Sequence, residues 1–140
     1  MLFRSLELLT HGQQVSVMAQ RYIPEISTMG DKRILLINGE PVAHALARIP
    51  APGELRGNLA AGASGKVVAI TDRDRWLCAQ IAPVLQAKGL YFVGIDIIGD
   101  YLTEINVTSP TCIREISAET GLDIAGDYLR CLGTLKGMMS

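Results

Sequence analysis

The stretch Gly94-Ile-Asp-Ile-Ile-Gly-Asp-Tyr-Leu-Thr-Glu-Ile-Asn-Val-Thr-Ser-Pro-Thr-Cys-Ile-Arg114 contains two apolar segments that acidic and amide side chains interrupt. The second segment, residues 101 to 107, has the composition of a strand, and side chains along a strand alternate between its two faces. Leu102, Glu104 and Asn106 should therefore share one face, with Glu104 and Asn106 about 7 Å apart. A carboxylate and an amide oxygen placed in this way could be two ligands of a metal site made only of oxygen atoms.

A second carboxylate, Asp96, lies on the preceding segment, and the intervening turn decides which face it takes. A two-residue turn at Gly99-Asp100 would pair Asp96 with Thr103 and point it away, whereas a three-residue loop would pair it with Glu104. We predict the three-residue loop. Asp96, Glu104 and Asn106 would then form a ligand set suited to Mg²⁺, with Mn²⁺ as the alternative metal.

Composition limits the classes of function. The chain has 140 residues, 49% hydrophobic and 19% charged, and a net charge of −1, so we expect one folded domain and neither a nucleic-acid nor a membrane partner. The 3 cysteines show no Cys-x-x-Cys spacing and indicate reduced thiols rather than a disulfide framework. We therefore expect a cytoplasmic protein.

A hairpin is predicted around Asn38-Gly39, which favours a two-residue turn between strands at residues 32 to 37 and 41 to 48. This pairing puts Arg33 opposite His44 and places Arg33 and Arg48 on a common face. Two such arginines form either a solvated stripe or a clamp for phosphate oxygens. Both interpretations are open from spacing alone.

Several segments resemble the C-terminal part of bacterial glutathione synthetases, which are ATP-grasp ligases. They include Val93-Gly-Ile-Asp-Ile-Ile-Gly-Asp, Leu102-Thr-Glu-Ile-Asn-Val-Thr-Ser-Pro-Thr, Ala47-Arg-Ile-Pro and Arg56-Gly-Asn-Leu-Ala-Ala-Gly. The resemblance runs from about Leu6 to Ile116 and weakens after Glu119. The Glu-x-Asn of the closing strand is common to ATP-grasp enzymes, whereas its Val-Thr-Ser-Pro-Thr continuation and the Arg-Gly-Asn-Leu-Ala-Ala-Gly loop point to this family.

The fold expected is a single α+β domain over residues 1–140, with a mostly antiparallel sheet, helices on one face and a glycine-rich lid loop at about residues 50 to 65. A helix is predicted at Leu2 to Thr10 and a strand at Val15 to Gln20. Thr71-Asp-Arg-Asp74 resembles a capping box that opens a helix to Lys88.

The resemblance also implies roles for individual residues. Arg33, Arg48 and Arg56 would be catalytic, and the arginine of the lid would face an acyl phosphate. ATP would contact Gln20, Tyr22, Arg33 and Asn106. Ser109 and Thr111 lie near a predicted helix start, where free backbone donors favour an anion. By resemblance they contribute, with Arg56 and Asn58, to the peptide-substrate site.

The implied reaction joins γ-glutamylcysteine to glycine through an acyl phosphate, with ATP as co-substrate. Complete members of the family that the chain resembles carry an N-terminal substrate domain and a lysine-bearing ATP subdomain ahead of the matching segment. The resemblance therefore implies that these 140 residues are inactive alone. Two alternatives stay open: another ATP-grasp amino-acid ligase, and a non-catalytic nucleotide-binding domain. The sequence leaves the oligomeric state open, a homo-oligomer included.

Overall fold

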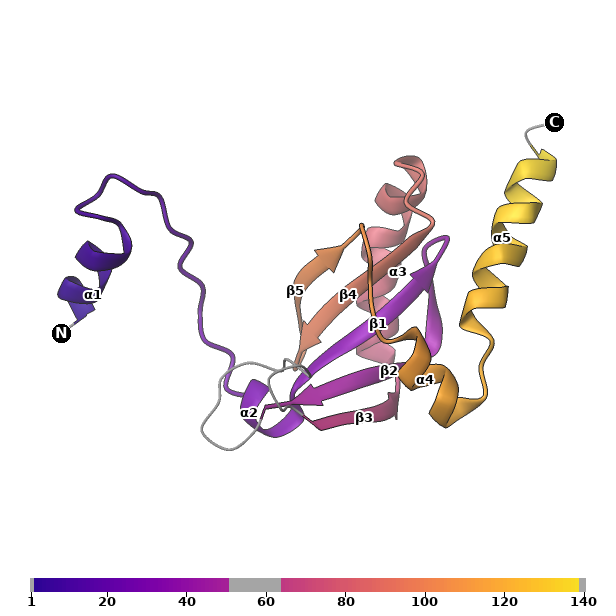
Figure 1. Ribbon diagram of the computed structural model, residues 1–140, viewed down its shortest axis with the longest axis horizontal. Coiled ribbons are helices and arrows are strands. Elements are labelled where there is room, and N and C mark those ends of the chain that lie inside the picture. The colour runs from indigo at the N-terminus through magenta and orange to yellow at the C-terminus, as the bar shows by residue number, and fades with distance from the viewer. Residues whose placement is uncertain (1, 51–63, 139–140) are drawn as a thin grey trace.

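The computed structural model describes residues 2–50 and 64–138. In this part of the chain, five strands form one antiparallel sheet in the order β3-β2-β1-β4-β5 (Figure 1). The predicted α+β class and antiparallel sheet are confirmed. The elements in chain order are α1 (Leu2–Leu9), α2 (Ile26–Met29), β1 (Asp31–Ile37), β2 (Glu40–Ile49), β3 (Ser64–Ala69), α3 (Asp72–Ala87), β4 (Phe92–Ile98), β5 (Tyr101–Asn106), α4 (Ile113–Thr120) and α5 (Ile124–Met138).

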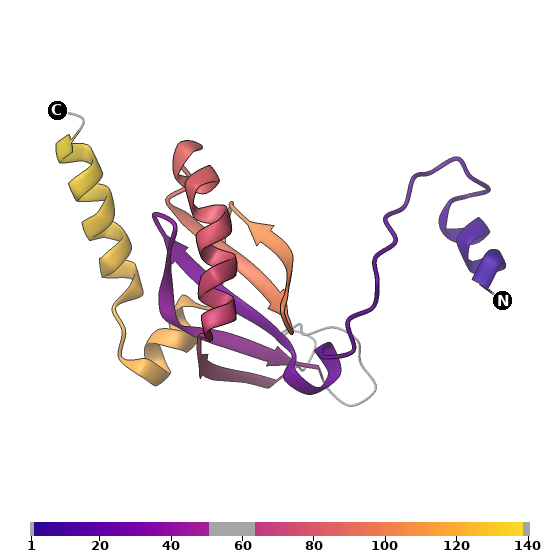
Figure 2. The same ribbon diagram turned by 180° about the vertical axis from the view of Figure 1, so that it is seen from behind.

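Helices cover both faces of the sheet, so the predicted placement on one face is wrong. Helix α3 packs on one face over a core that includes Ile34 and Ile95. Helices α4 and α5 pack on the other face, where Ile116 and Ile124 contact the cluster around Leu35. Helix α3 lies behind the sheet in Figure 1 and in front of it in Figure 2. The central strand requires both layers, because its neighbouring residues Ile34 and Leu35 point to opposite faces and both are fully buried.

The first hairpin has the predicted two-residue turn, in which Asn38 and Gly39 both adopt positive φ angles of 50° and 83°. The register then shifts within the strand pair, so Arg33 lies opposite Leu46 and not opposite His44 as predicted. The shift amounts to two residues, and side chains alternate with a period of two. The shift therefore leaves Arg33 on the predicted face.

The second hairpin has a different turn from the one predicted, but it pairs Asp96 with Glu104 as predicted. Its turn holds two residues, Gly99-Asp100, so the three-residue loop is wrong. Asp96 still pairs with Glu104, because a bulge adds Thr103 to β5. The Thr103 hydroxyl donates a hydrogen bond to the Asp96 backbone oxygen at 3.1 Å. The bulge also turns Leu102 toward the α3 core, so Leu102 does not share the face of Glu104 as predicted.

The N-terminal segment is a helix followed by extended chain. Helix α1 confirms the predicted helix, whereas Val15 to Gln20, predicted as a strand, is not part of any strand. A strand forms only where a neighbouring strand accepts its backbone hydrogen bonds, and no described strand lies beside this segment. Met18 is accordingly 83% exposed. Figure 1 shows α1 well apart from the sheet.

Helix α3 begins at the predicted capping box. The Thr71 hydroxyl accepts a hydrogen bond from the Asp74 backbone at 3.1 Å, and the Asp74 carboxylate accepts one from the Thr71 backbone at 2.9 Å. The helix includes Pro83 and continues to Ala87. None of the helices within the described ranges has the length and apolar composition needed to cross a membrane.

Candidate functional site

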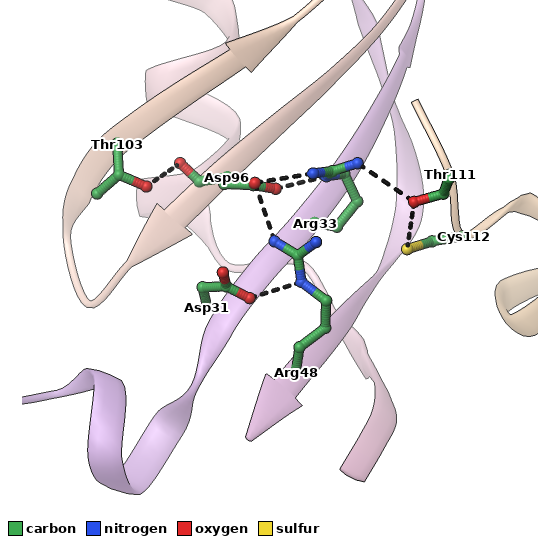
Figure 3. A network of polar contacts seen from close by, with 7 residues as sticks. All are labelled: Asp31, Arg33, Arg48, Asp96, Thr103, Thr111 and Cys112. Carbon is green, nitrogen blue, oxygen red and sulfur yellow. Dashed lines mark hydrogen bonds and ion pairs between the residues drawn. The ribbon is translucent and has the colours of Figure 1, made fainter. Parts of the chain in front are cut away.

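Charged side chains gather on the sheet face that α4 covers, at one end of strands β1, β2 and β4. Strand pairing places them: Asp31 lies opposite Arg48, and Arg33 lies opposite Asp96. These four residues are the charged members of the network in Figure 3. Two guanidinium groups and two carboxylates balance in charge, which is what burial of such groups requires.

The Asp96 carboxylate is the centre of this network. Arg33 binds it through two parallel hydrogen bonds, Nε to Oδ1 at 2.5 Å and Nη2 to Oδ2 at 2.8 Å. Arg48 also donates to Oδ2, at 2.9 Å, and its Nε donates to Oδ1 of Asp31 at 2.6 Å. Asp96 is 4% exposed and Arg33 5% exposed. The fork from Arg33 to one carboxylate and the bonds that Arg48 divides between two carboxylates hold both guanidinium groups in place.

Burial and ion pairing act against each other on the two carboxyl groups, and the pKa of Asp96 and that of Asp31 shift in opposite directions. For Asp96, burial favours the neutral form, but the hydrogen bond from Arg33 and the charge of Arg48 outweigh it, and the pKa is lowered. For Asp31, burial is the largest effect and raises the pKa, and Arg48 offsets it only in part. The hydrogen bond to Asp96 raises the pKa of Arg33. Both arginines therefore stay charged.

Two of the three predicted metal ligands have the properties of ligands to a hard cation. Asn106 is partly buried, and its Oδ1 atom is fully enclosed without a hydrogen-bond partner. Glu104 is exposed and lies opposite Asp96 on the same face. A buried acceptor without a donor is unfavourable, and a bound cation would satisfy it. Carboxylate and amide oxygens suit Mg²⁺ or Mn²⁺.

Asp96 fits the metal site less simply, because both of its oxygens already accept hydrogen bonds from arginines. Within the described residues, no group of three or more His, Cys, Asp and Glu side chains could hold a metal ion. Glu104 and Asn106 are the predicted ligands whose oxygens no arginine occupies, whereas Asp96 would have to share an oxygen with the arginines.

The predicted substrate residues lie just before α4. Arg33 donates to the Thr111 hydroxyl at 3.5 Å, and that hydroxyl lies 3.7 Å from the Cys112 sulfur, so Thr111 borders the arginine network. Cys112 has a positive φ of 89° ahead of the helix. Ser109 is exposed on the same loop. The structure thus brings Thr111 to the candidate site and leaves Ser109 at its edge.

The two residues predicted to contact adenine, Gln20 and Tyr22, do not line the same cavity. Tyr22 lines a cavity of about 310 Å³ together with neighbouring residues up to Glu25 and with Tyr101 from the second hairpin. Gln20 is exposed and does not line this cavity. Sequence reasoning missed Tyr101, because only the folded hairpin brings it to Tyr22. Arg56 and Asn58 lie outside the described residues.

Asp31 is the second residue that sequence reasoning missed. Asp31 is the first residue of β1 and lies directly opposite Arg48. The sequence does not reveal this pairing, because it depends on the register shift in the strand pair. Gly30, just before it, has a φ of +70°, and a side chain there would collide with the Arg48 backbone oxygen. Only glycine allows this close approach.

Comparison with known proteins identifies the family. The family model described as prokaryotic glutathione synthetase, ATP-grasp domain, matches residues 2–121. The chain belongs to the prokaryotic glutathione synthetase family. The predicted resemblance is thereby confirmed.

Curated relatives in this family carry the name glutathione synthetase. The Coxiella burnetii protein is 58% identical over 129 residues, which cover 92% of this chain and 40% of the relative. The Pseudomonas putida protein is 63% identical over 89% of this chain and 39% of its own length. The Pseudomonas aeruginosa protein is 66% identical over 79% of this chain and 35% of its own length. The chain thus spans about 40% of the length of the first of these glutathione synthetases.

Proposed function

We propose that this chain is the ATP-grasp portion of a ligase that joins γ-glutamylcysteine to glycine, with hydrolysis of ATP to ADP and phosphate. The observation that carries the proposal is a pair of guanidinium groups, Arg33 buried and Arg48 partly buried, on the face that also holds Asn106, in a chain of this family. Guanidinium forks match phosphate oxygens, and amide and carboxylate oxygens match the divalent ion that accompanies ATP.

In this proposal Arg33 and Arg48 bind and orient the phosphate that passes to the cysteinyl carboxylate. Their positive charges stabilise the charge that spreads over the phosphoryl oxygens during transfer. The glycine amine then attacks the acyl phosphate and phosphate leaves. Arg56 would face that intermediate and, with the segment between β2 and β3 as a lid, exclude water from it.

The ion would be held by Glu104 and Asn106, with Asp96 as the shared third ligand. Mg²⁺, with Mn²⁺ as the alternative, would neutralise phosphate charge when bound. Asn106 and Arg33 would also contact the nucleotide. Gln20 and Tyr22 would contact its adenine.

The peptide would contact the loop before α4 and the lid, through Ser109, Thr111, Arg56 and Asn58. Residues 1–140 would act as one domain in the cytoplasm, and a homo-oligomer is compatible with every step. Activity would need parts of the relatives that these 140 residues do not span, so the chain alone is expected to form no glutathione.

A chimera tests the function. This chain replaces the matching segment of the Pseudomonas putida glutathione synthetase, to which it is 63% identical over 124 residues. The expected result is glutathione formation from ATP, γ-glutamylcysteine and glycine. Glu104→Gln in the chimera should abolish product, while Thr103→Ala, on the neighbouring residue, should retain most of it. A folded chimera that makes no product, or equal losses from both substitutions, would contradict the proposal.

A further inference from the structure

We propose that Asp31 is a positioning residue that fixes the Arg48 guanidinium independently of Asp96. That a fixed Arg48 guanidinium aids phosphate binding rests on the proposed function. The positioning itself concerns only residues that the structure describes. Asp31 contributes no atom to the phosphate or metal contacts proposed above and acts through Arg48 alone.

The two arginines are anchored differently. Arg33 directs both of its strong hydrogen bonds to Asp96, through Nε and Nη2. Arg48 divides its bonds between two carboxylates: its Nε donates to Asp31 at 2.6 Å and its Nη2 donates to Asp96 at 2.9 Å. If Asp96 turns an oxygen toward a cation, Arg48 therefore keeps a charge-assisted bond. Arg33 would keep its long contact with Thr111 at 3.5 Å.

The backbone holds Asp31 firmly enough to serve as an anchor. Asp31 is the cross-strand partner of Arg48. The residue before it, Gly30, packs so closely on the Arg48 and Ile49 backbone that no side chain fits there. Helix α2 ends at Met29 with Gly30 as its C-terminal cap, and its residue Ile26 is only 6% exposed. The Asp31 carboxylate thus starts from a fixed main chain rather than from a loop.

The Asp31 to Arg48 contact is also sheltered. The side chains of Arg48 and Asp31 are 13% and 19% exposed. Partial burial excludes much of the water that would compete for the guanidinium, and a charge-assisted hydrogen bond in such a place is stronger than one in solvent. A surface ion pair would not hold an arginine in one position.

Hydrogen exchange of the arginine Nε–H groups, followed by NMR on the 140-residue chain, tests the proposal. Arg48→Lys and Arg33→Lys identify the two signals. In Asp31→Ala, exchange of the Arg48 Nε–H should accelerate on the order of tenfold, while the Arg33 Nε–H, which Asp96 holds, should change little. Asp31→Glu should restore part of the protection. Asp72→Asn, an exposed acid on α3, serves as the control and should change neither signal.

Unchanged protection of Arg48 in Asp31→Ala would overturn the proposal, as would equal acceleration of both arginines, which would show a general loosening of the fold. If Asp31→Ala does not fold, Asp31→Asn keeps the shape of the side chain and removes its charge. In Asp31→Asn, exchange of the Arg48 Nε–H is then expected to accelerate by less than in Asp31→Ala, and exchange of the Arg33 Nε–H is expected to stay unchanged.

Tripolyphosphate binding in the presence of Mg²⁺ separates this proposal from the proposed function. Removing a negative charge beside Arg48 should by itself tighten binding of an anion, so weaker binding to Asp31→Ala reports lost positioning. We expect weakening on the order of tenfold. Tighter binding would overturn the positioning role. Failure of the unsubstituted chain to bind tripolyphosphate would count against the proposed function, and the exchange rates would still decide the anchoring of Arg48.

Discussion

At the residue scale, the ion pairs of Asp96 occupy the same oxygens that its proposed place in the metal site would use. Asp96 binds the guanidinium groups of Arg33 and Arg48, and it lies opposite Glu104 in the strand pair. Glu104 is exposed, so the fold does not depend on its charge in the way that it depends on that of Asp96. Substitution should therefore separate a residue on which the fold depends from one on which only ligand binding depends.

Asp96→Asn should lower the free energy of unfolding by about 3 to 5 kcal/mol, because it leaves the buried Arg33 guanidinium without its carboxylate partner and removes one of the two carboxylates that Arg48 binds. Glu104→Gln should change it by less than about 0.5 kcal/mol, as is usual for exposed positions. Urea denaturation of the two variants and the unsubstituted chain measures both values. Equal stability of Asp96→Asn and Glu104→Gln would contradict the network in Figure 3.

The pH dependence of stability should have opposite signs for the two aspartates. The pKa of Asp96 is lowered from 3.8, so its ionised form stabilises the fold above that pH and the contribution is lost as pH falls through the folded pKa. The pKa of Asp31 is raised from 3.8, so its contribution is complete below that pH and is lost as pH rises through the folded pKa.

Denaturation midpoints across the acid range test these signs. The stability difference between the unsubstituted chain and Asp96→Asn should widen as pH rises toward 3.8 and then stay constant. The difference for Asp31→Asn should instead narrow as pH rises above 3.8. Parallel curves for the two variants would show that the two carboxylates do not differ in environment.

At the element scale, helix α3 is attached to the sheet by a charge as well as by its apolar side. Asp74 is fully buried and accepts two hydrogen bonds from Lys32 Nζ, each 2.7 Å long. The same carboxylate closes the capping box with Thr71. The Asp74 side chain thus accepts a hydrogen bond from a backbone N–H at the start of the helix and also ties the helix to β1 through Lys32.

Thr71→Ala should cost about 1 kcal/mol, the usual value for a lost helix cap. Asp74→Asn should cost about 3 to 5 kcal/mol, because it also leaves the Lys32 ammonium buried without its partner. Asp72→Asn, in the same helical turn but exposed, should cost less than about 1 kcal/mol. Thermal unfolding followed by circular dichroism ranks the three, and any other order would contradict this attachment.

At the scale of the whole molecule, the sheet separates two cores that have different roles. The α3 side holds apolar packing around Cys78, and the α4 side holds the core around Cys112 next to the arginine network. Both thiols are buried, whereas Cys131 on α5 is partly exposed. The three cysteines are free, as predicted.

Thiol labelling should therefore report the opening of each core separately. In the folded chain at neutral pH, Cys131 should react first, because burial raises the pKa of Cys78 to about 11 and also raises that of Cys112. Raising the pH toward 11 should increase the reactive thiolate at Cys78. Mass spectrometry of labelled peptides at increasing urea gives the order. Early labelling of Cys78 under native conditions would contradict a closed α3 core.

Local sequence alone determined the features that depend on neighbouring residues. The Asn38-Gly39 turn, the Thr71 capping box and the alternation that aligns Glu104 with Asn106 all follow from backbone preferences within a few residues. The family could also be recognised in this way, because its motifs are short and contiguous.

Only the tertiary structure decided the contacts between distant residues. Two register shifts, which no local pattern marks, set which residues face one another across the strands. Packing on both faces of β1 placed α3 and α4 on opposite sides of the sheet. Pairing over 63 positions joined Arg33 to Asp96, and pairing over 17 joined Asp31 to Arg48. Such choices depend on how the whole core fills its volume, so they are settled only when the chain has folded.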